Sequence, residues 1–293
     1  MAKYILRYLF LFGVSFIVAC KKFSPKLDTP SYISIPSYNV IYKSTYANGG
    51  PGTTNHKFTD VTVTVNGVDY GIFPIPCKVP IPASGSASVN IKPVIKVNGV
   101  ASLRSEYSPI KLFDTTVVLE RGKVTEVKPT FDYYATGVTF YWVEDFEITG
   151  SSLVGDTAIK LQTADKFEGA KAVKIELRNG QSSCMAYSSS TFALPTGGRI
   201  LYLEVNYKCN QPFDVGLLDA NKNIVGGSSA GGAKPSGAWN KIYIFLTPVA
   251  SGSPQSAYYV YFYFNNKAED FENNGVGANP TVLIDNIKVV SQP

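Results

Sequence analysis

Histidine is almost absent from this chain of 293 residues, since His56 is the only one. A mechanism that needs two histidines is therefore excluded. Charged residues are also few, at 17%, while hydrophobic residues reach 45% and the mean hydropathy of +0.02 argues against disorder. The net charge of +5 is small and no stripe of lysine and arginine occurs, so nucleic acid is not an expected partner.

The sequence also lacks the motifs that mark common active sites. No G-x-S-x-G, P-loop, HExxH or GxGxxG is present. Glu144, Asp145 and Glu147 lie on one predicted strand, where neighbours point to opposite faces, whereas a glycosidase needs two carboxyl groups about 5–10 Å apart across a cleft. His56 follows a glycine-rich stretch, which favours a solvated loop histidine over a base or a ligand. The sequence therefore predicts that the protein is not an enzyme.

The start of the chain is an apolar run with two basic residues, Lys3 and Arg7, near its beginning. The run from Leu9 to Ala19 is too short to span a membrane and fits a signal peptide. Ile17-Val18-Ala19-Cys20 resembles the bacterial lipobox, in which cleavage precedes the cysteine and its sulfur is lipidated. The resemblance implies a signal peptide at residues 1–19 and a palmitate-type anchor on Cys20. A plain secretory signal is the alternative.

Residues 20–37 contain three prolines and show no helical or strand period, so they are expected to form a lipidated tether. This start resembles lipoproteins of the Bacteroidetes, which implies an outer-membrane location. In that group acidic residues after the cysteine often direct export to the outer leaflet. Lys21 and Lys22 stand there instead, so the periplasmic and the cell-surface side both stay open.

Residues 38–134 are expected to form a small β-sandwich. Period-2 alternation predicts strands at 59–65, 87–94, 115–119 and 124–129, and Asn66-Gly67 predicts a tight hairpin between two strands. The stretch VTVNGVDYGIFPIPCKVP, followed by GSASVNIKP, resembles the PEGA-type modules of bacterial surface proteins. The resemblance implies a module that presents or spaces a neighbouring domain.

Residues 135–293 are expected to form a second all-β unit without helices. Strands are predicted at 172–177, 200–207, 213–218, 241–246, 258–264 and 282–290. The landmarks EDFE, EGAKAVKIEL, WNKIYIFL and VLIDNIKVV follow one another in an order that resembles the carbohydrate-binding jelly-roll modules of bacterial glycanases. That resemblance implies an antiparallel jelly-roll sandwich of the galactose-binding-like class.

The same resemblance implies a structural calcium ion. Its ligands would be the carbonyls of Asp145 and Lys171 and the carboxylates of Glu147, Glu168 and Asp285. Calcium takes 6 to 8 oxygen ligands, and this set supplies oxygens of both kinds. Alternation also places the Asp285 carboxylate on the apolar side of its strand, where a cation partner is expected. The alternative is a salt-bridged or hydrogen-bonded aspartate at the sheet edge.

After lipidation of Cys20, three cysteines remain. Cys184 and Cys209 lie in the same half and can form a disulfide, which an envelope compartment permits, or stay as two buried thiols. No spacing of cysteine and histidine suits zinc.

A ligand surface is predicted on two strands. Alternation turns Leu201, Leu203, Val205 and Tyr207 toward the core and sends Tyr202, Glu204 and Asn206 outward. On the later strand it sends Tyr259, Tyr261 and Tyr263 outward. Tyrosine rings with polar neighbours can stack on sugars, but tyrosine ladders also stabilise exposed sheets through cross-strand pairs.

Two functions follow from these features. The first is a non-catalytic outer-membrane lipoprotein that binds a polysaccharide through its jelly roll. The second is a structural or accessory lipoprotein of an outer-membrane assembly for secretion, gliding or glycan uptake, which uses the same faces for protein contacts. The composition does not separate the two, because exposed tyrosines serve sugar and protein partners alike.

Overall fold

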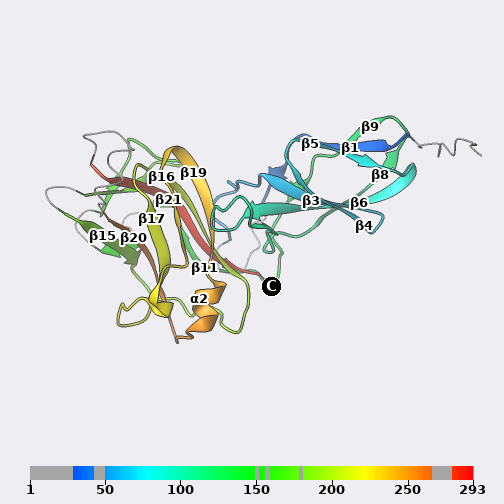
Figure 1. The fold of residues 1–293 in the computed structure, drawn as a ribbon. Helices are drawn as coiled ribbons and strands as arrows, with labels where there is room; N and C mark the ends of the chain where they lie inside the picture. Colours follow the sequence, from blue (N-terminus) through cyan, green and yellow to red (C-terminus); the bar gives the residue numbers. More distant parts are fainter. Residues whose placement is uncertain are drawn as a thin grey trace, which may run out of the picture.

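The computed structural model describes residues 29–42, 50–148, 152–155, 159–177, 181–265 and 279–292. The signal peptide and the lipidation site Cys20 therefore lie outside the described residues. Two sandwiches stand side by side, an N-terminal unit whose strands lie between residues 31 and 131 and a jelly roll whose strands begin at residue 139 (Figure 1). The predicted all-β architecture is confirmed.

The N-terminal unit has two main sheets and a short pair of strands. Its larger sheet has the order β4-β3-β6, and β7 and β8 pair with successive parts of the far edge of β6. These strands are β3 (Asp60–Val65), β4 (Val68–Pro74), β6 (Gly85–Lys96), β7 (Arg104–Glu106) and β8 (Phe113–Leu119). The opposing sheet consists of β5 (Cys77–Ile81), β1 (Ser31–Ile35) and β9 (Val124–Glu126), and the short pair of β2 (Asn39–Val40) and β10 (Thr130–Phe131).

The local sequence explains two of these strands. Asn66 and Gly67 both have positive φ, at 50° and 78°, and join β3 to β4 as the hairpin signal predicted. The tether prediction was wrong at Ser31–Ile35, which forms β1 between two paired strands. Buried and half-buried residues alternate in this strand, with residues 31, 33 and 35 buried. The alternating segment is only five residues long and has a proline on each side, so it was not recognised in the sequence.

The jelly roll has two sheets, which we name by what they carry. The interface sheet, which faces the N-terminal unit, contains β13 (Ile159–Gln162), β14 (Ala172–Glu176), β21 (Thr281–Ser291), β16 (Leu201–Cys209) and β19 (Ser236–Phe245), with β11 (Thr139–Glu144) also on β21. The tyrosine sheet contains β12 (Leu153–Gly155), β15 (Ser183–Ser188), β20 (Tyr259–Asn265), β17 (Phe213–Leu218) and β18 (Gly231–Ala233).

The expectation of a helix-free C-terminal unit was wrong, because α2 (Thr247–Gly252) follows β19 and the 3-10 turn η2 (Val225–Gly227) packs near it. Pro248 stands at the start of α2, where its missing N–H is not needed. No helix in the described part of the chain has the length and apolarity needed to cross a membrane.

The core between the two jelly-roll sheets confirms the predicted faces. It contains Leu201, Leu203, Val205 and Tyr207 from β16, and Val260, Phe262 and Phe264 from β20. Trp142 is also buried there, where its ring stacks on Phe192 at 5.7 Å. A second buried cluster fills the N-terminal unit and continues onto Phe140, Tyr202, Tyr243 and Val290 of the interface sheet. The two sandwiches thus share a packed boundary.

Candidate functional site

The predicted ligand surface divides between the two faces of the jelly roll. β16 belongs to the interface sheet and β20 to the tyrosine sheet, so Tyr202, Glu204 and Asn206 lie on the opposite side from Tyr259, Tyr261 and Tyr263. The alternation was read correctly on both strands. The prediction of a single binding platform made of both sets was wrong, because the two strands lie in different sheets.

Tyr202, Glu204 and Asn206 are also inaccessible. They retain 3%, 0% and 1% of their exposure, because the N-terminal unit covers the outer face of the interface sheet. The ring of Tyr202 packs against Tyr107 at 5.4 Å between centroids. These three residues hold the two sandwiches together, and the ligand role predicted for them was wrong.

Glu204 is the centre of a buried polar network at this boundary. Lys288, directly opposite on β21, places Nζ 3.3 Å from Oε2, and Lys241 on β19 places Nζ 3.0 Å from the same oxygen. From the N-terminal unit, Tyr107 and Tyr133 donate their hydroxyls to Oε1, the latter at 3.0 Å. Burial lowers the pKa of Lys288 to about 8, against the attraction of Glu204.

His56 joins the same network. Its ring stacks on Phe58 at 4.6 Å, and its two nitrogens lie 3.3 Å from the Tyr243 hydroxyl and 3.1 Å from the Tyr133 hydroxyl. Burial holds the pKa of His56 well below its ordinary value, so the ring is neutral at pH 7. The prediction of a solvated loop histidine was wrong, because the glycine-rich loop brings the ring under the boundary.

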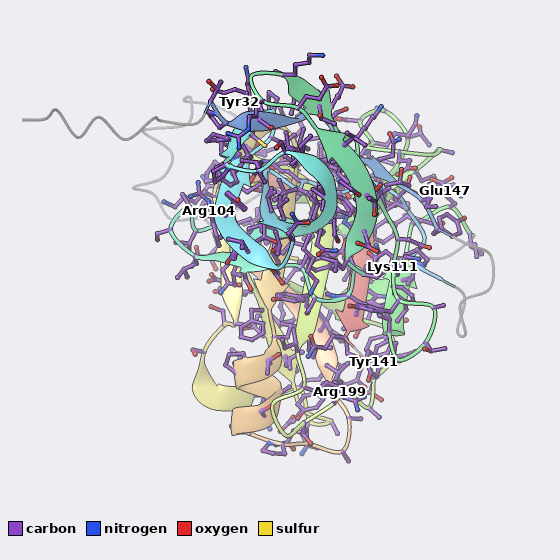
Figure 2. The ribbon with its side chains drawn as sticks, turned by 90° about the vertical axis from the view of Figure 1, so that its right-hand side faces the viewer. Tyr32, Arg104, Lys111, Tyr141, Glu147 and Arg199 are labelled. Carbon is purple, nitrogen blue, oxygen red and sulfur yellow. The ribbon has the colours of Figure 1, made fainter. Side chains whose placement is uncertain are left out.

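The predicted calcium residues do converge on one corner, at the edge of the molecule where Figure 2 labels Glu147. In this corner the acid groups accept hydrogen bonds. Oε1 of Glu147 accepts from the N–H groups of Ala170 and Lys171, at 2.7 and 3.0 Å. These bonds lower the pKa of Glu147. Asp145 accepts from the N–H of Glu147 at 3.1 Å.

Asp285 and Glu168 are held in the same way. Oδ2 of Asp285 accepts from the N–H groups of Phe167 and Glu168, at 3.0 and 3.2 Å. Glu168 Oε2 accepts from Thr53 at 2.6 Å and from the Asn286 side chain at 3.1 Å. Burial raises the pKa of Asp285 to about 6 despite its three backbone hydrogen bonds.

The strand that carries Asp285 is irregular. Its pairing with β16 shifts between Glu204 and Asn206, and Asn286 has a positive φ of 49°. Val282 and Ile284 face the core before this bulge, and Ile287 and Val289 after it. Asp285 therefore lies on the side away from the core, and its predicted placement among the apolar residues was wrong.

These residues do not fit a ready-made calcium site. The ammonium of Lys171 lies 3.4 Å from the Glu147 carbonyl, and N–H donors already approach the carboxylates. No group of three acidic, histidine or cysteine side chains in the described ranges is arranged to hold a metal ion. Calcium stays a prediction from the sequence resemblance.

Cys184 and Cys209 do not form a disulfide. Cys184 lies on β15 of the tyrosine sheet and Cys209 at the end of β16 on the interface sheet, and both are buried in the core between the sheets. Burial raises the pKa of Cys209 to about 11. Of the two alternatives that the sequence left open, the structure has two buried thiols.

The remaining predicted residues form the candidate site, the outer surface of the tyrosine sheet. Tyr259, Tyr261 and Tyr263 face away from the core on β20, and the register brings Tyr187 and Met185 of β15 and Asp214 of β17 to the same side. We call this surface the tyrosine face: Met185, Tyr187, Asp214, Tyr259, Tyr261 and Tyr263.

The rings of the tyrosine face are positioned by close contacts. Tyr187 and Tyr259 meet edge to face at 5.7 Å, and Lys222 Nζ lies 4.6 Å from the centre of the Tyr187 ring and 2.7 Å from its hydroxyl. Tyr261 lies over Gly216, where a Cβ atom would come within 2.6 Å of the ring. Tyr259 and Tyr263 are half-buried, so both are accessible to solvent. Tyr261 is 2% exposed, so the ligand role predicted for this residue was wrong, and its ring packs over Gly216 instead.

Tyr187, Asp214 and Lys222 were missed from the sequence. The alternation in SCMAYS places Tyr187 on one side with Met185, and this short strand was not predicted. Lys222 comes from the turn after β17, and its position over Tyr187 depends on the sheet order rather than on any spacing in the sequence.

No protein-family profile and no curated protein matches the chain. Solved structures resemble about half of it. An arabinose-bound α-L-arabinofuranosidase of glycoside hydrolase family 51 is 12% identical over 52% of this chain and 27% of its own, with a TM-score of 0.38. This chain therefore spans about a quarter of that enzyme's length.

Two carbohydrate-binding structures give similar values. A family 61 carbohydrate-binding module in complex with β-1,4-galactotriose is 16% identical over 47% of this chain and 85% of its own, with a TM-score of 0.31. The tandem family 22 modules of Xyn10C from Paenibacillus barcinonensis are 10% identical over 54% and 47%, with a TM-score of 0.37. All three TM-scores are below 0.5, and nothing about the function of this chain follows from the likeness.

Proposed function

We propose that this chain is a non-catalytic glycan-binding protein, in which the tyrosine face binds saccharides and a lipid on Cys20 anchors the chain to the outer membrane. The observation that carries the binding part is the set of tyrosine rings brought into register on β15 and β20. The anchor rests on the lipobox resemblance at residues 17–20.

The chemistry of the tyrosine face suits a sugar. The half-buried rings of Tyr259 and Tyr263 offer flat apolar area with a polar tip, which stacks on the C–H face of a sugar ring. Lys222, in the turn after β17, and Asp214, beside Tyr263 on β17, offer a donor and an acceptor for hydroxyl groups. The edge-to-face contact with Tyr187 holds the ring of Tyr259, so less side-chain entropy is lost when this ring binds.

A glycan array with the soluble chain from Lys21 to Pro293, which keeps every described residue, tests the proposal. Binding of one sugar class is expected, together with its loss in Tyr259→Ala and in Tyr263→Ala. Tyr42→Ala is the matched control, because Tyr42 is 48% exposed in the N-terminal unit, away from the tyrosine face.

The variants also separate binding from sheet stabilisation. If the tyrosines only stabilise the sheet through cross-strand pairs, Tyr259→Ala lowers the melting temperature and no glycan binds to either protein. A wild-type protein that binds no sugar on the array, or binds it equally well in both tyrosine variants, contradicts the proposal.

The anchor is tested separately. Wild-type protein expressed in a bacterium with a lipoprotein pathway is expected to incorporate a labelled fatty acid and to sediment with membranes. Cys20→Ser is expected to lose both properties, whereas Cys77→Ser is expected to keep them. Label that persists in Cys20→Ser contradicts lipidation at this residue.

One observation favours a second candidate, an accessory role in an outer-membrane assembly. β4 is an edge strand of the N-terminal unit, and Val68 and Ile72 on it are 57% and 43% exposed. Edge strands with exposed apolar side chains pair readily with another chain. Crosslinking from a photoreactive residue at position 72 to a specific envelope protein, without any glycan binding, would favour this role.

A further inference from the structure

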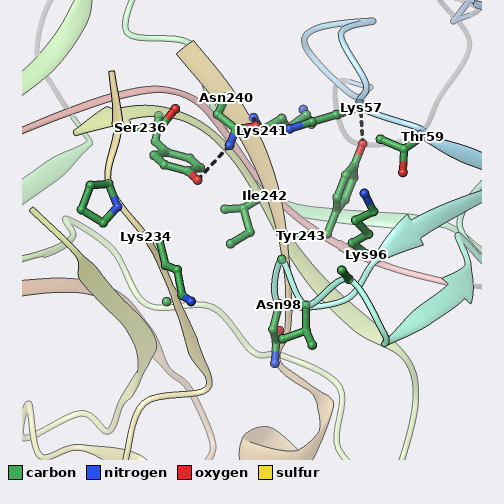
Figure 3. Close-up of a pocket in the computed structure, with 16 residues that line it drawn as sticks. Lys57, Thr59, Lys96, Asn98, Lys234, Ser236, Asn240, Lys241, Ile242 and Tyr243 are labelled. Carbon is green, nitrogen blue, oxygen red and sulfur yellow. Dashed lines mark hydrogen bonds between the residues drawn. The ribbon is translucent and has the colours of Figure 1, made fainter. Parts of the chain in front are cut away.

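A cavity of about 560 Å³ lies between the two sandwiches, on the side where both jelly-roll sheets end in edge strands (Figure 3). Lys57 and the turn from Lys96 to Ala101 enclose it from the N-terminal unit. β18, β19 and the loop between them enclose it from the jelly roll. This volume is within the range of about 300–1,000 Å³ that is typical of small-ligand sites.

The lining of this cavity carries charge of one sign. It includes Lys57, Lys96, Lys234 and Lys241 and no acidic residue. In Figure 3 Lys57 and Lys96 approach from the N-terminal unit and Lys234 from the loop before β19. Burial and, next, the charge of Lys96 lower the pKa of Lys57. Asn98 and Ser236 add uncharged polar groups to the lining.

A second observation points to an anion at the same place. The Lys241 side chain is 2% exposed, and Glu204 is the carboxylate near its ammonium. The single charge of Glu204 is shared with Lys288, and the neutral His56 adds no negative charge. Apart from its 3.0 Å ion pair with Oε2 of Glu204, Nζ of Lys241 has no hydrogen-bond partner within the part of the chain that the structure describes. Two buried ammonium groups thus share one carboxylate beside the cavity, and a buried charge that is only partly compensated is stabilised when an opposite charge approaches.

The cavity also adjoins the tyrosine face. Gly232 lines the cavity and pairs with Asp214, which in turn pairs with Tyr263, so the three residues share one side of the tyrosine sheet. Two strand spacings, about 10 Å in total, separate Tyr263 from Gly232. A saccharide chain that crosses β17 and β18 from the tyrosine face thus reaches Gly232 at the rim of the cavity.

We propose that this cavity binds the oxyanion of an acidic glycan, a carboxylate of a uronic acid or a sulfate ester on a sugar ring. The saccharide part of this inference rests on the proposed function, and the anion part rests on the cavity itself. Lys57, Lys96 and Lys234 would contact the oxyanion directly, and Lys241, which lines the cavity in front of Glu204, would add buried positive charge.

Calorimetric titrations of the chain from Lys21 onward test this with three polymers: neutral galactan, polygalacturonate and dextran sulfate. The measurements use 0.15 M salt, where the Debye length is about 8 Å, so that distant charges contribute little. The pocket variant combines Lys57→Gln, Lys96→Gln and Lys234→Gln. The matched control combines Lys78→Gln, Lys128→Gln and Lys160→Gln, three exposed lysines outside the cavity lining that give the same net charge.

The wild-type protein is expected to bind one of the two acidic polymers at least about tenfold more tightly than galactan, a preference that the pocket variant loses and the control variant keeps. Polygalacturonate binding assigns a carboxylate, and dextran sulfate binding assigns a sulfate ester. Equal weakening in both triple variants, or no preference for an acidic polymer, overturns the inference.

Tyr259→Ala separates this inference from the proposed function. If galactan binding is lost in Tyr259→Ala while the pocket variant changes nothing, the proposed function stands and the acidic site is wrong. If the pocket variant loses the acidic polymer while Tyr259→Ala binds every polymer as the wild-type protein does, the acidic site stands and the role of the tyrosine face is wrong. Melting temperatures confirm that each variant is folded.

Discussion

Glu204 and Lys288 face each other on neighbouring strands of the interface sheet, with Oε2 and Nζ 3.3 Å apart and with side chains that are 0% and 1% exposed. The N-terminal unit covers this pair, and its residues Tyr107 and Tyr133 complete the hydrogen bonds of the carboxylate. The stability of each sandwich therefore depends on the other, because the buried carboxylate of the jelly roll accepts hydrogen bonds from hydroxyl groups of the N-terminal unit.

Replacement of Glu204 by glutamine is expected to lower the free energy of unfolding by about 3–5 kcal/mol. The substitution leaves the ammonium groups of Lys241 and Lys288 buried without a counter-charge. Chemical denaturation followed by tyrosine fluorescence measures the loss.

Glu106→Gln is the control for this change. Glu106 forms an exposed ion pair with Lys92 at 3.2 Å, in which the glutamate side chain is 45% exposed. A loss below about 1 kcal/mol is expected there. Equal losses in the two variants would show that the Glu204 network is not buried as described.

The raised pKa of Asp285 makes the stability of the folded protein depend on pH. Its pKa of about 6 in the folded protein lies above the ordinary 3.8, so the folded chain binds this proton more tightly than the unfolded chain does. The resulting stability is fully present below about pH 4 and is lost as the pH rises through about 6. Relative to Asp285→Asn, the wild-type protein is expected to gain about 1 kcal/mol between pH 7.5 and pH 5. Melting curves at both pH values measure the difference, which Asp69→Asn, an exposed site, should not reproduce.

Calcium removal tests the remaining prediction from the sequence. Hydrogen-bond donors already approach the carboxylates of Glu147, Glu168 and Asp285, so equal melting temperatures are expected in calcium and in EDTA. A bound calcium would instead favour the ionised form of Asp285. A higher melting temperature in calcium, together with loss of the Asp285 pH effect, would restore the calcium site.

The sequence predicted the β16 and β20 faces because alternation of period 2 is a local property. Tyr202, Glu204 and Asn206 do point away from the jelly-roll core. Their burial under another sandwich has no local signal, because an outward face looks the same whether water or a second unit covers it. The polar pattern of a buried charge network and that of a ligand surface are alike.

Other features of the structure arise from irregular or long-range contacts, which a periodic sequence pattern does not contain. The bulge at Asp285 and Asn286 reverses which residues of β21 face the core. His56 is buried by the path of a loop, and the partners of Tyr187 follow from the order of strands that are far apart in the chain. The strand β1 was not predicted, because prolines stand on both sides of its five residues. Each of these is a tertiary effect that local propensity does not contain.

Thiol reactivity provides a direct test of the cysteine arrangement. In the native soluble chain, Cys77 is half-buried, whereas Cys184 and Cys209 are buried and burial raises the pKa of Cys209 to about 11. A thiolate-directed reagent is therefore expected to label Cys77 first. All three thiols are expected to react after denaturation without a reductant. A single reactive thiol under those conditions would indicate a disulfide between Cys184 and Cys209.

Gly216 controls the position of the Tyr261 ring. A Cβ atom at residue 216 would come within 2.6 Å of that ring, so Gly216→Ala forces the ring or strand β17 to move. Overpacking of this kind destabilises a protein by about 1–3 kcal/mol. Gly237→Ala on β19 is the matched control, because nothing lies within 4 Å of the added atom, and little loss is expected.

The same pair of variants links packing to binding. Since Tyr261 lies between Tyr259 and Tyr263 on one side of β20, a displaced ring disturbs the surface on which a sugar would stack. Gly216→Ala is therefore expected to weaken glycan binding at a temperature where the variant is still fully folded, while Gly237→Ala binds as the wild-type protein does. Titration of both variants with the glycan selected on the array measures this. Unchanged affinity in Gly216→Ala, despite a lowered melting temperature, would show that the sugar does not contact the tyrosine face.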